Sequence, residues 1–352
     1  MSCYYVGLDV HKASICIAVL NAGGKLVMES VIETSAATIL GFLKELRGEV
    51  HVTFEEGTHA AWLYDVLKKI KAQVIVCDPR KNRLLQDGNK SDKVDARKLA
   101  QLLRAGLLSA VYHGEHGTRD LKELVRSYEY LVEDSTRVMN RIKALYRSRA
   151  IACAGTDVYK VRQREAWLAK LPEAGAQARA GRLFSELDHL TSLRREARRA
   201  LVAECRRHPA SKLLLKVPTL GIIRIAQLIA NIVTPHRFRG KRQFWSYCGL
   251  AVVTKSSADY RVAGEQVRRT RKAATRGLTQ SYNRTLKYVF KSAALTASRC
   301  GPFKAWYAEL VERGLRPELA RVTIARRIAA ITLAVWKSGE VFNAEKLIRP
   351  TA

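Results

Sequence analysis

The sequence has few acidic residues for its number of basic ones, and it has no pair of cysteines at the short spacing that is typical of metal sites. Its 352 residues include 32 Asp and Glu against 62 Lys and Arg. The seven cysteines are scattered without a C-x-x-C pair, and the eight histidines include no H-E-x-x-H. This odd number and scatter argue against a disulfide framework or a zinc finger, and favour buried thiols in a reducing compartment.

Long hydrophobic runs are also missing. The longest ones, such as residues 328–335, are far shorter than the roughly 20 apolar residues of a membrane-spanning helix. The chain enters an apolar strand pattern directly, and no signal peptide is visible. We therefore expect a cytoplasmic protein without a membrane partner. His113 and His116 fall in a glycine-rich stretch and are expected to belong to a linker rather than to a metal site.

Positive charge is the strongest compositional signal. The formal net charge of +30 predicts a polyanionic partner, and nucleic acid is the usual one. No acidic residue occurs between Glu265 and Glu309, where basic residues are interleaved with Tyr282, Tyr288 and Phe290. A solvated basic face would not explain so long a run without counter-charge. The predicted nucleic-acid-binding residues of this region are Arg268, Arg269, Arg271, Lys272, Arg276, Arg284 and Lys287.

Hydrophobic periodicity predicts an α/β region at residues 1–112. Three strands come first as a meander, and two further strands and three helices then alternate to give the order β-β-β-α-β-α-β-α. Residue 34 or 35 is expected to cap the helix over 36–46, and Thr58 the helix that follows. The order predicts a mixed sheet flanked by helices, as in the RNase H-like fold.

The rest of the chain is predicted to be mainly helical. Residues 121–145 carry apolar positions at alternating spacings of three and four, and a second such seam covers 183–201. Two interpretations stay open: an ordinary helical hairpin, or a coiled coil that also joins protomers. We expect a hairpin at 113–208 and a helical C-terminal domain at 209–352.

Four carboxylates carry the candidate chemistry. Asp9 follows the first apolar strand pattern, Glu55 ends the fourth strand, and Asp92 and Asp95 are three residues apart at the start of a helix, on one helical face. Such a cluster is costly to bury unless cations pair with it. Two Mg²⁺ ions would satisfy it and would also promote phosphoryl transfer. For Asp92 or Asp95 alone, a favourable place at the positive end of the helix dipole is the simpler explanation.

Four motifs occur in order along the chain: GLDVHK at 7–12, FEEGTHAAWLY at 54–64, KSDKVDARKLA at 90–100, and VPTLG followed by CGLAVVTKSSADYR within 217–261. Together they resemble the DEDD-type transposases of the insertion-sequence 110 group, also called bridge-RNA-guided recombinases. The resemblance covers nearly the whole chain.

The resemblance implies a RuvC-like N-terminal domain of RNase H fold, a coiled-coil linker and a C-terminal transposase domain. It implies that Asp9, Glu55, Asp92 and Asp95 are catalytic and bind Mg²⁺ or Mn²⁺, with Glu56 as an alternative to Glu55. It also implies a serine nucleophile. Ser257 matches best and Ser256 is the alternative; Ala258 follows, where many members have glycine. Lys255 and Arg261 flank these serines and could hold a phosphate.

The activity that the resemblance implies is the cutting and rejoining of double-stranded donor and target DNA through a phosphoserine link. A guide RNA would pair with both DNAs, and the carboxylates of one protomer would act with the serine of another in a dimer or tetramer. Three alternatives stay open: a metal-dependent nuclease or junction resolvase that uses water, an actin-like kinase or ATPase, and a non-enzymatic nucleic-acid-binding protein. Val10, His11 and Lys12 follow Asp9 where an actin-like phosphate loop would need glycine and Ser or Thr.

Overall fold

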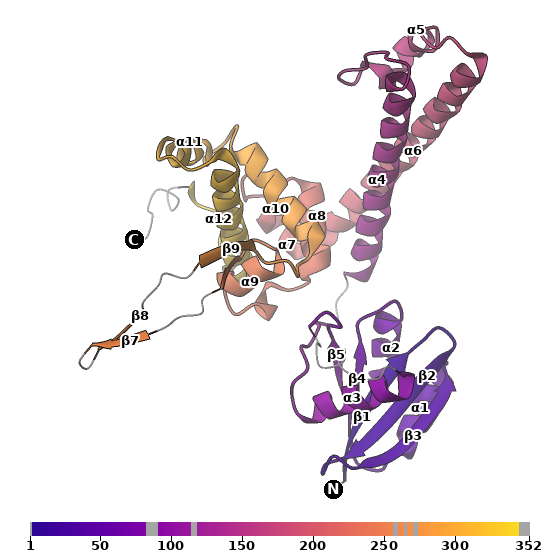
Figure 1. Ribbon diagram of the computed structural model, residues 1–352, viewed down its shortest axis with the longest axis vertical. Coiled ribbons are helices and arrows are strands. Elements are labelled where there is room, and N and C mark those ends of the chain that lie inside the picture. The colour runs from indigo at the N-terminus through magenta and orange to yellow at the C-terminus, as the bar shows by residue number, and fades with distance from the viewer. Residues whose placement is uncertain are drawn as a thin grey trace. The chain divides into compact units, whose positions relative to one another are not determined.

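The structure is a computed structural model that describes residues 2–81, 91–113, 118–255, 260–263, 266–269 and 274–344. The chain divides into two compact units, Met1–Glu115 and His116–Ala352 (Figure 1). The first boundary lies close to the one expected at residue 112, and a further boundary near residue 208 stays a prediction. No helix within the described ranges is both long and apolar enough to cross a membrane.

The first unit is built on a five-stranded mixed sheet with the strand order β3-β2-β1-β4-β5. The first three strands pair antiparallel, whereas β4 lies parallel to β1 and β5 lies parallel to β4. This arrangement fits the α/β, RNase H-like fold that the sequence predicted. The strands are β1 (Cys3–Val10), β2 (Ser14–Asn21), β3 (Leu26–Glu33), β4 (Glu49–Glu55) and β5 (Gln73–Cys77).

One face of the sheet holds the main core of this unit. Val6, Leu8 and Phe54 are fully buried there with apolar residues of α1 (Ala36–Glu45) and α2 (Ala60–Leu67). Ser35 caps α1 by accepting a hydrogen bond from the Thr38 backbone N–H. The expected Thr58 cap of α2 is wrong: α2 begins after His59, without a side-chain cap.

The opposite face is covered by α3 (Asp92–Arg104), whose N-terminus is capped by Ser91. Gly7 in β1 allows the close approach of this helix. A Cβ atom at Gly7 would lie 2.1 Å from the Ala96 carbonyl oxygen and 2.6 Å from the Ala100 nitrogen, both backbone atoms. Because backbone atoms cannot move aside as a flexible side chain can, only glycine fits at this crossing.

The second unit begins with two long helices, α4 (Arg119–Arg147) and α6 (Ala174–Arg207), which contact each other along their length (Figure 1). Between them lie η2 (Asp157–Tyr159), η3 (Val161–Gln163) and α5 (Arg164–Leu168). Val138, Ile142 and Leu187 of the predicted seams are buried in one core with Trp167 of α5. The helical pairing agrees with both interpretations of the seams, and the joining of protomers stays a prediction.

The remaining helices of the second unit enclose the largest core, to which Leu121 of α4 and Leu201 of α6 also contribute. These helices are α7 (Pro209–Leu214), α8 (Ile222–Ile232), η4 (Pro235–Arg237), α9 (Lys241–Tyr247), α10 (Arg284–Ala297), α11 (Lys304–Glu312) and α12 (Pro317–Ser338).

Two antiparallel strand pairs interrupt these helices, in a domain that the sequence predicted to be helical. They are β6 (Val252–Lys255) with β9 (Ala274–Leu278), and β7 (Tyr260–Ala263) with β8 (Gln266–Arg269). The strands are only four or five residues long. Such short strands rarely show a period-two pattern, so local sequence did not reveal them.

The close crossing at Gly7 generates a stability prediction. We expect Gly7→Ala to lower the free energy of unfolding by about 1–3 kcal/mol, as overpacking does, because the new methyl group must push α3 away from β1. Urea denaturation followed by circular dichroism measures this change.

Gly41→Ala is the matched control. Gly41 lies within α1 and has nothing within 4 Å of its would-be Cβ. Alanine should therefore stabilise that helix, by roughly 0.5–1 kcal/mol. Equal effects of the two substitutions would contradict the proposed role of Gly7.

Candidate active site

The strand register brings the first two predicted carboxylates to one edge of the sheet. Leu8 pairs with Phe54 in the parallel β1–β4 ladder, so the next residues, Asp9 near the end of β1 and Glu55 at the end of β4, lie at the same edge of the sheet. Side chains alternate along a strand. Asp9 therefore shares the face of Gly7, which is the face that α3 covers.

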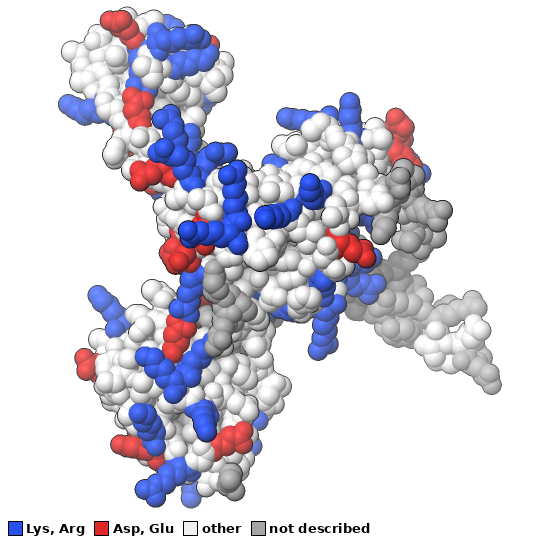
Figure 2. All heavy atoms as spheres, turned by 180° about the vertical axis from the view of Figure 1, so that it is seen from behind, with Lys and Arg blue, Asp and Glu red and all other residues white. Residues whose placement is uncertain are grey.

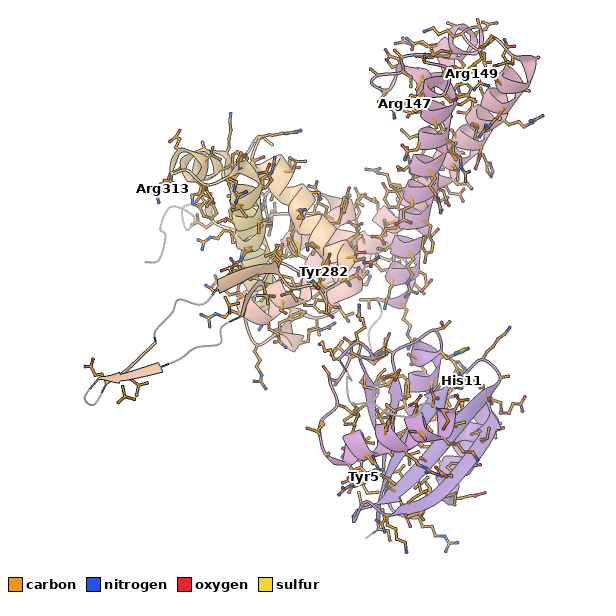
Figure 3. The ribbon with its side chains drawn as sticks, viewed as in Figure 1. Tyr5, His11, Arg147, Arg149, Tyr282 and Arg313 are labelled. Carbon is orange, nitrogen blue, oxygen red and sulfur yellow. The ribbon has the colours of Figure 1, made fainter. Side chains whose placement is uncertain are left out.

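The first turn of α3 places Asp92 next to Asp9, with His11 between them. The His11 Nε2 atom lies 3.2 Å from Asp9 Oδ2 and 3.4 Å from Asp92 Oδ2. One ligand atom from each of these three residues lies within 4.8 Å of the others, an arrangement that could hold a metal ion. Sequence reasoning did not assign a role to His11, although the GLDVHK motif contains it; Figure 3 marks its position.

Asp95 supplies an unpartnered oxygen at this site. Its Oδ1 atom is buried and has no hydrogen-bond partner within the part of the chain that the structure describes. Such an atom is costly to bury unless a cation or a proton satisfies it. Its place one turn along α3 from Asp92 is the one predicted from the spacing of three residues.

The carboxylates influence one another electrostatically. Burial raises the pKa of Asp9 above its ordinary value, His11 opposes this shift, and the charges of Asp92 and Asp95 raise the pKa further. Burial also raises the pKa of the Cys16 thiol, which faces the same site from β2, and the charges of Asp92 and Asp9 add to this shift. The site therefore concentrates negative charge, which a cation would neutralise.

Glu55 and Glu56 have different surroundings. Glu55 is half-buried and lines a small hollow at the end of β4 together with Gly57, Thr58 and His59. Glu56 is exposed and forms an ion pair with His113, a residue that the sequence assigned to a linker. Glu55 is not part of the group of ligand atoms around His11 that the described residues form. The roles of both glutamates in metal binding stay predictions.

The predicted nucleophile and part of the predicted basic surface lie outside the described residues. These are Ser256, Ser257, Arg271 and Lys272. The strands β6 to β9 carry the backbone positions of Lys255, Arg261, Arg268, Arg269 and Arg276.

The start of α10 shows the basic character of this region most directly. Arg284 is its first residue, and Lys287 Nζ lies 4.0 Å from the centre of the Tyr282 ring, which Figure 3 labels. The first turn contains no acidic residue. Cations at a helix N-terminus interact unfavourably with the helix dipole. An external anion bound there would interact favourably with both the cations and the dipole. Figure 2 shows further Lys and Arg side chains spread over both units.

Fold and site together define a class of protein: a basic chain with a carboxylate cluster at the edge of an RNase H-like sheet. Comparison with known proteins specifies the class further. Residues 6–148 match the family model for transposases of the IS110 DEDD type, and residues 211–308 match the family model described as transposase IS116/IS110/IS902. The chain therefore belongs to the IS110 group of DEDD transposases.

Individual relatives carry similar names. The transposase of insertion sequence element IS1533 of Leptospira borgpetersenii is 32% identical over 47% of this chain and 50% of its own length. A protein of Sinorhizobium fredii, provisionally named transposase y4qE, is 26% identical over 89% of this chain and 77% of its own length. An uncharacterized 44.8 kDa protein of insertion element IS116 of Streptomyces clavuligerus is 22% identical over 99% of this chain and 98% of its own length. The match thus spans half the length of the Leptospira protein and nearly all of the Streptomyces one.

The raised pKa of Asp9 predicts how the site affects stability. When the pKa of a carboxyl group is higher in the folded than in the unfolded state, the free energy of unfolding falls as the pH rises through the range between the two pKa values. Ionised Asp9 therefore opposes folding at neutral pH when no metal is bound. We expect Asp9→Asn to raise the thermal midpoint by a few degrees in EDTA. Mn²⁺ should raise the midpoint of the wild type and have much less effect on the variant.

Differential scanning fluorimetry with and without Mn²⁺ measures both effects. Glu45→Gln is the control, because Glu45 is an exposed carboxylate at the end of α1, which packs on the opposite face of the sheet. This variant should keep the wild-type response to Mn²⁺. A full Mn²⁺ response in Asp9→Asn would show that Asp9 is not a ligand.

Proposed function

We propose that this chain is the transposase of an insertion sequence and that it cuts and rejoins double-stranded DNA. In this proposal Asp9, Glu55, Asp92 and Asp95 hold Mg²⁺ or Mn²⁺. The observation that carries the proposal is the meeting of Asp9 and Asp92 around His11, with the unpartnered Asp95 oxygen on the same helical face. Carboxylate oxygens are the ligands that these hard cations prefer, so the residues present fit the ion.

The metal, when bound, would polarise the scissile phosphate and stabilise the charge of the leaving oxygen. The protein's own contribution is to fix its ligands. The register of β1 and β4 sets the positions of Asp9 and Glu55, and the crossing at Gly7 sets the height of α3 above them. The Ser91 cap keeps the first turn of α3 helical, so that Asp92 and Asp95 face the sheet edge together.

The proposed nucleophile is Ser257, with Ser256 as the alternative. β6 ends at Lys255 and β7 begins at Tyr260, so these serines connect two strands that carry basic residues. The serine Oγ would form a bond to phosphorus while the bond between phosphorus and the leaving sugar oxygen breaks. The serine proton would pass to solvent or to a base, and the leaving oxygen would take up a proton. Attack by the hydroxyl of another strand would reverse these changes and rejoin the DNA.

The proposed partners are DNA and a guide RNA. The helix start at Arg284 and Lys287, together with the basic strands β7 to β9, provides positive charge that would contact phosphates irrespective of base sequence. In this proposal sequence choice comes from base pairing with the RNA. The α4–α6 pair would join protomers as a coiled coil in a dimer or tetramer, which would allow the carboxylates of one protomer to act with the serine of another.

The serine mechanism has a direct test. Purified protein with donor DNA, target DNA, Mg²⁺ and the RNA encoded beside its gene should give a covalent protein–DNA adduct that peptide mapping locates at Ser257. We expect Ser257→Ala to abolish the adduct and strand exchange. The adduct should persist in Ser256→Ala and in the control Ser185→Ala, which alters an exposed serine of α6.

Two other outcomes would change the mechanism. Strand exchange by a variant that lacks both Ser256 and Ser257 would exclude a serine nucleophile at these positions. DNA cleavage that depends on Asp9 but never yields an adduct would identify a nuclease or resolvase that uses water.

The basic start of α10 generates a second prediction. The double variant Arg284→Gln, Lys287→Gln should bind DNA more weakly, with the slope of log K against log salt concentration reduced by about 1 for each lost phosphate contact. Fluorescence anisotropy at several salt concentrations measures the slope.

The control double variant is Arg126→Gln, Arg313→Gln, which removes the same charge from residues already paired with Glu123 and Glu309. Its slope should stay near that of the wild type. Equal slopes for the two double variants would show that net charge, and not the α10 surface, governs binding.

A further inference from the structure

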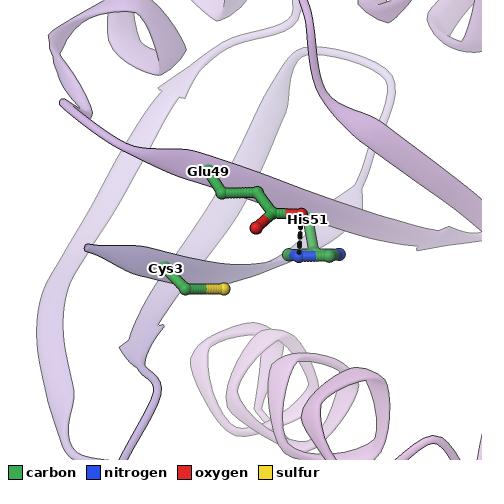
Figure 4. A group of neighbouring side chains, drawn as sticks. All are labelled: Cys3, Glu49 and His51. Carbon is green, nitrogen blue, oxygen red and sulfur yellow. Dashed lines mark ion pairs between the residues drawn. The ribbon is translucent and has the colours of Figure 1, made fainter. Parts of the chain in front are cut away.

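A second group of potential metal ligands lies on the sheet that carries the candidate active site. Among the described residues, two groups of three Cys, His, Asp or Glu side chains bring one ligand atom each within 4.8 Å of the others. One group is the cluster at Asp9. The other consists of Cys3, Glu49 and His51, shown in Figure 4.

Strand register explains why these three residues meet. Cys3 pairs with Glu49, and Tyr5 pairs with His51, in the parallel ladder between β1 and β4. Residues two apart on a strand share a face, so Cys3 lies on the same face of β1 as Asp9 but six residues away. That separation corresponds to about 20 Å along an extended strand. Figure 3 accordingly shows Tyr5 and His11 near opposite ends of the sheet.

The donor atoms of this group suit a different ion from that of the first site. A thiolate sulfur, an imidazole nitrogen and a carboxylate oxygen are the three ligand types of Zn²⁺, whereas Mg²⁺ prefers oxygen alone. His51 Nε2 already lies 3.2 Å from Glu49 Oε1. Neighbouring ligand atoms in a tetrahedral zinc site are about 3.3–3.8 Å apart, so closing the group around an ion needs only small side-chain movements.

Neighbouring side chains hold the ligands in place. The Tyr5 ring stacks on the His51 ring with 5.0 Å between centroids and 16° between planes. Gln73 Nε2 on β5 donates a hydrogen bond to Glu49 Oε1 at 3.4 Å. The side chains of Tyr5 and Cys3 also form a hydrogen bond. Outer contacts of this kind orient ligands in zinc sites.

The group is also accessible to an ion. The His51 side chain is 17% exposed and the Glu49 side chain is 57% exposed, while Cys3 is half-buried. Without a metal, the group is no more than a Glu–His ion pair beside a thiol. Such an exposed pair adds little to stability.

We propose that Cys3, Glu49 and His51 bind one Zn²⁺ ion, with water at the fourth position. This ion would fasten the start of β1 to the start of β4, the two strands whose opposite ends carry Asp9 and Glu55. The site is independent of the proposed recombination chemistry, because its ligands lie at the other end of the strands.

The test uses reduced, full-length protein that has been stripped with EDTA and returned to buffer with excess Mg²⁺ to occupy the carboxylate site. Competition with a chromophoric chelator should show one tightly bound Zn²⁺ per chain. Cys3→Ser and His51→Gln should each weaken this binding by at least about tenfold. Co²⁺ in place of Zn²⁺ should give the absorption of a tetrahedral, thiolate-ligated ion, and Cys3→Ser should abolish its thiolate band.

Two controls make the result specific. Cys300→Ser removes an exposed cysteine of the second unit, and Asp9→Asn with Asp92→Asn removes the carboxylate site; both variants should keep the Zn²⁺ affinity and the Co²⁺ spectrum. Glu49→Gln is a milder change at an exposed position and should also weaken Zn²⁺ binding if the other two variants fold poorly. Unchanged Zn²⁺ affinity in Glu49→Gln and Cys3→Ser, or its loss in the Asp9 and Asp92 double variant, would overturn the proposal.

Discussion

The burial of a carboxylate close to other carboxylates is the constraint on which the candidate site of the first unit depends. The β1 register and the α3 crossing bring Asp9 and Asp92 to opposite sides of His11, and Asp95 follows one turn along the helix. Burial raises the pKa of Asp9, and the charges of Asp92 and Asp95 add to this shift. The glycine crossing and the capped helix nearby fix this arrangement, which a cation would make more favourable in the proposed function.

The rest of the chain complements this negative site with positive charge. A carboxylate cluster repels a nucleic-acid phosphate, and a net charge of +30 attracts the whole polyanion. The basic start of α10 and the strands β6 to β9 lie in the second unit, whereas Asp9 and its neighbours lie in the first. In the proposed function, attraction of the DNA backbone and chemistry at one phosphate would thus belong to separate units. A metal ion bound to the carboxylates would make the local charge of the site positive and so would attract the phosphate that reacts.

The sheet itself has two chemically different ends. Small residues occupy the middle of the face under α3, where Gly7 admits the helix backbone and Cys16, Ala18 and Ala96 pack together. The Asp9 and Asp92 carboxylates with the His11 imidazole lie at one end, and a thiol, an imidazole and a carboxylate lie at the other. A single pleated face can thus present two ligand sets, since its alternate residues all point the same way.

Much of this protein could be predicted from local sequence. The order of elements in the first unit, the Ser91–Asp95 helix start, the basic run near Arg284 and the family motifs all depend on neighbouring residues, whose types and spacing the sequence states directly. Tertiary structure alone decided the meeting of His11 with Asp92 and of Cys3 with His51, and the pairing of β6 with β9. The physical reason is that strand register and helix crossing join residues far apart in the chain, and no local period encodes which distant partner a side chain will contact.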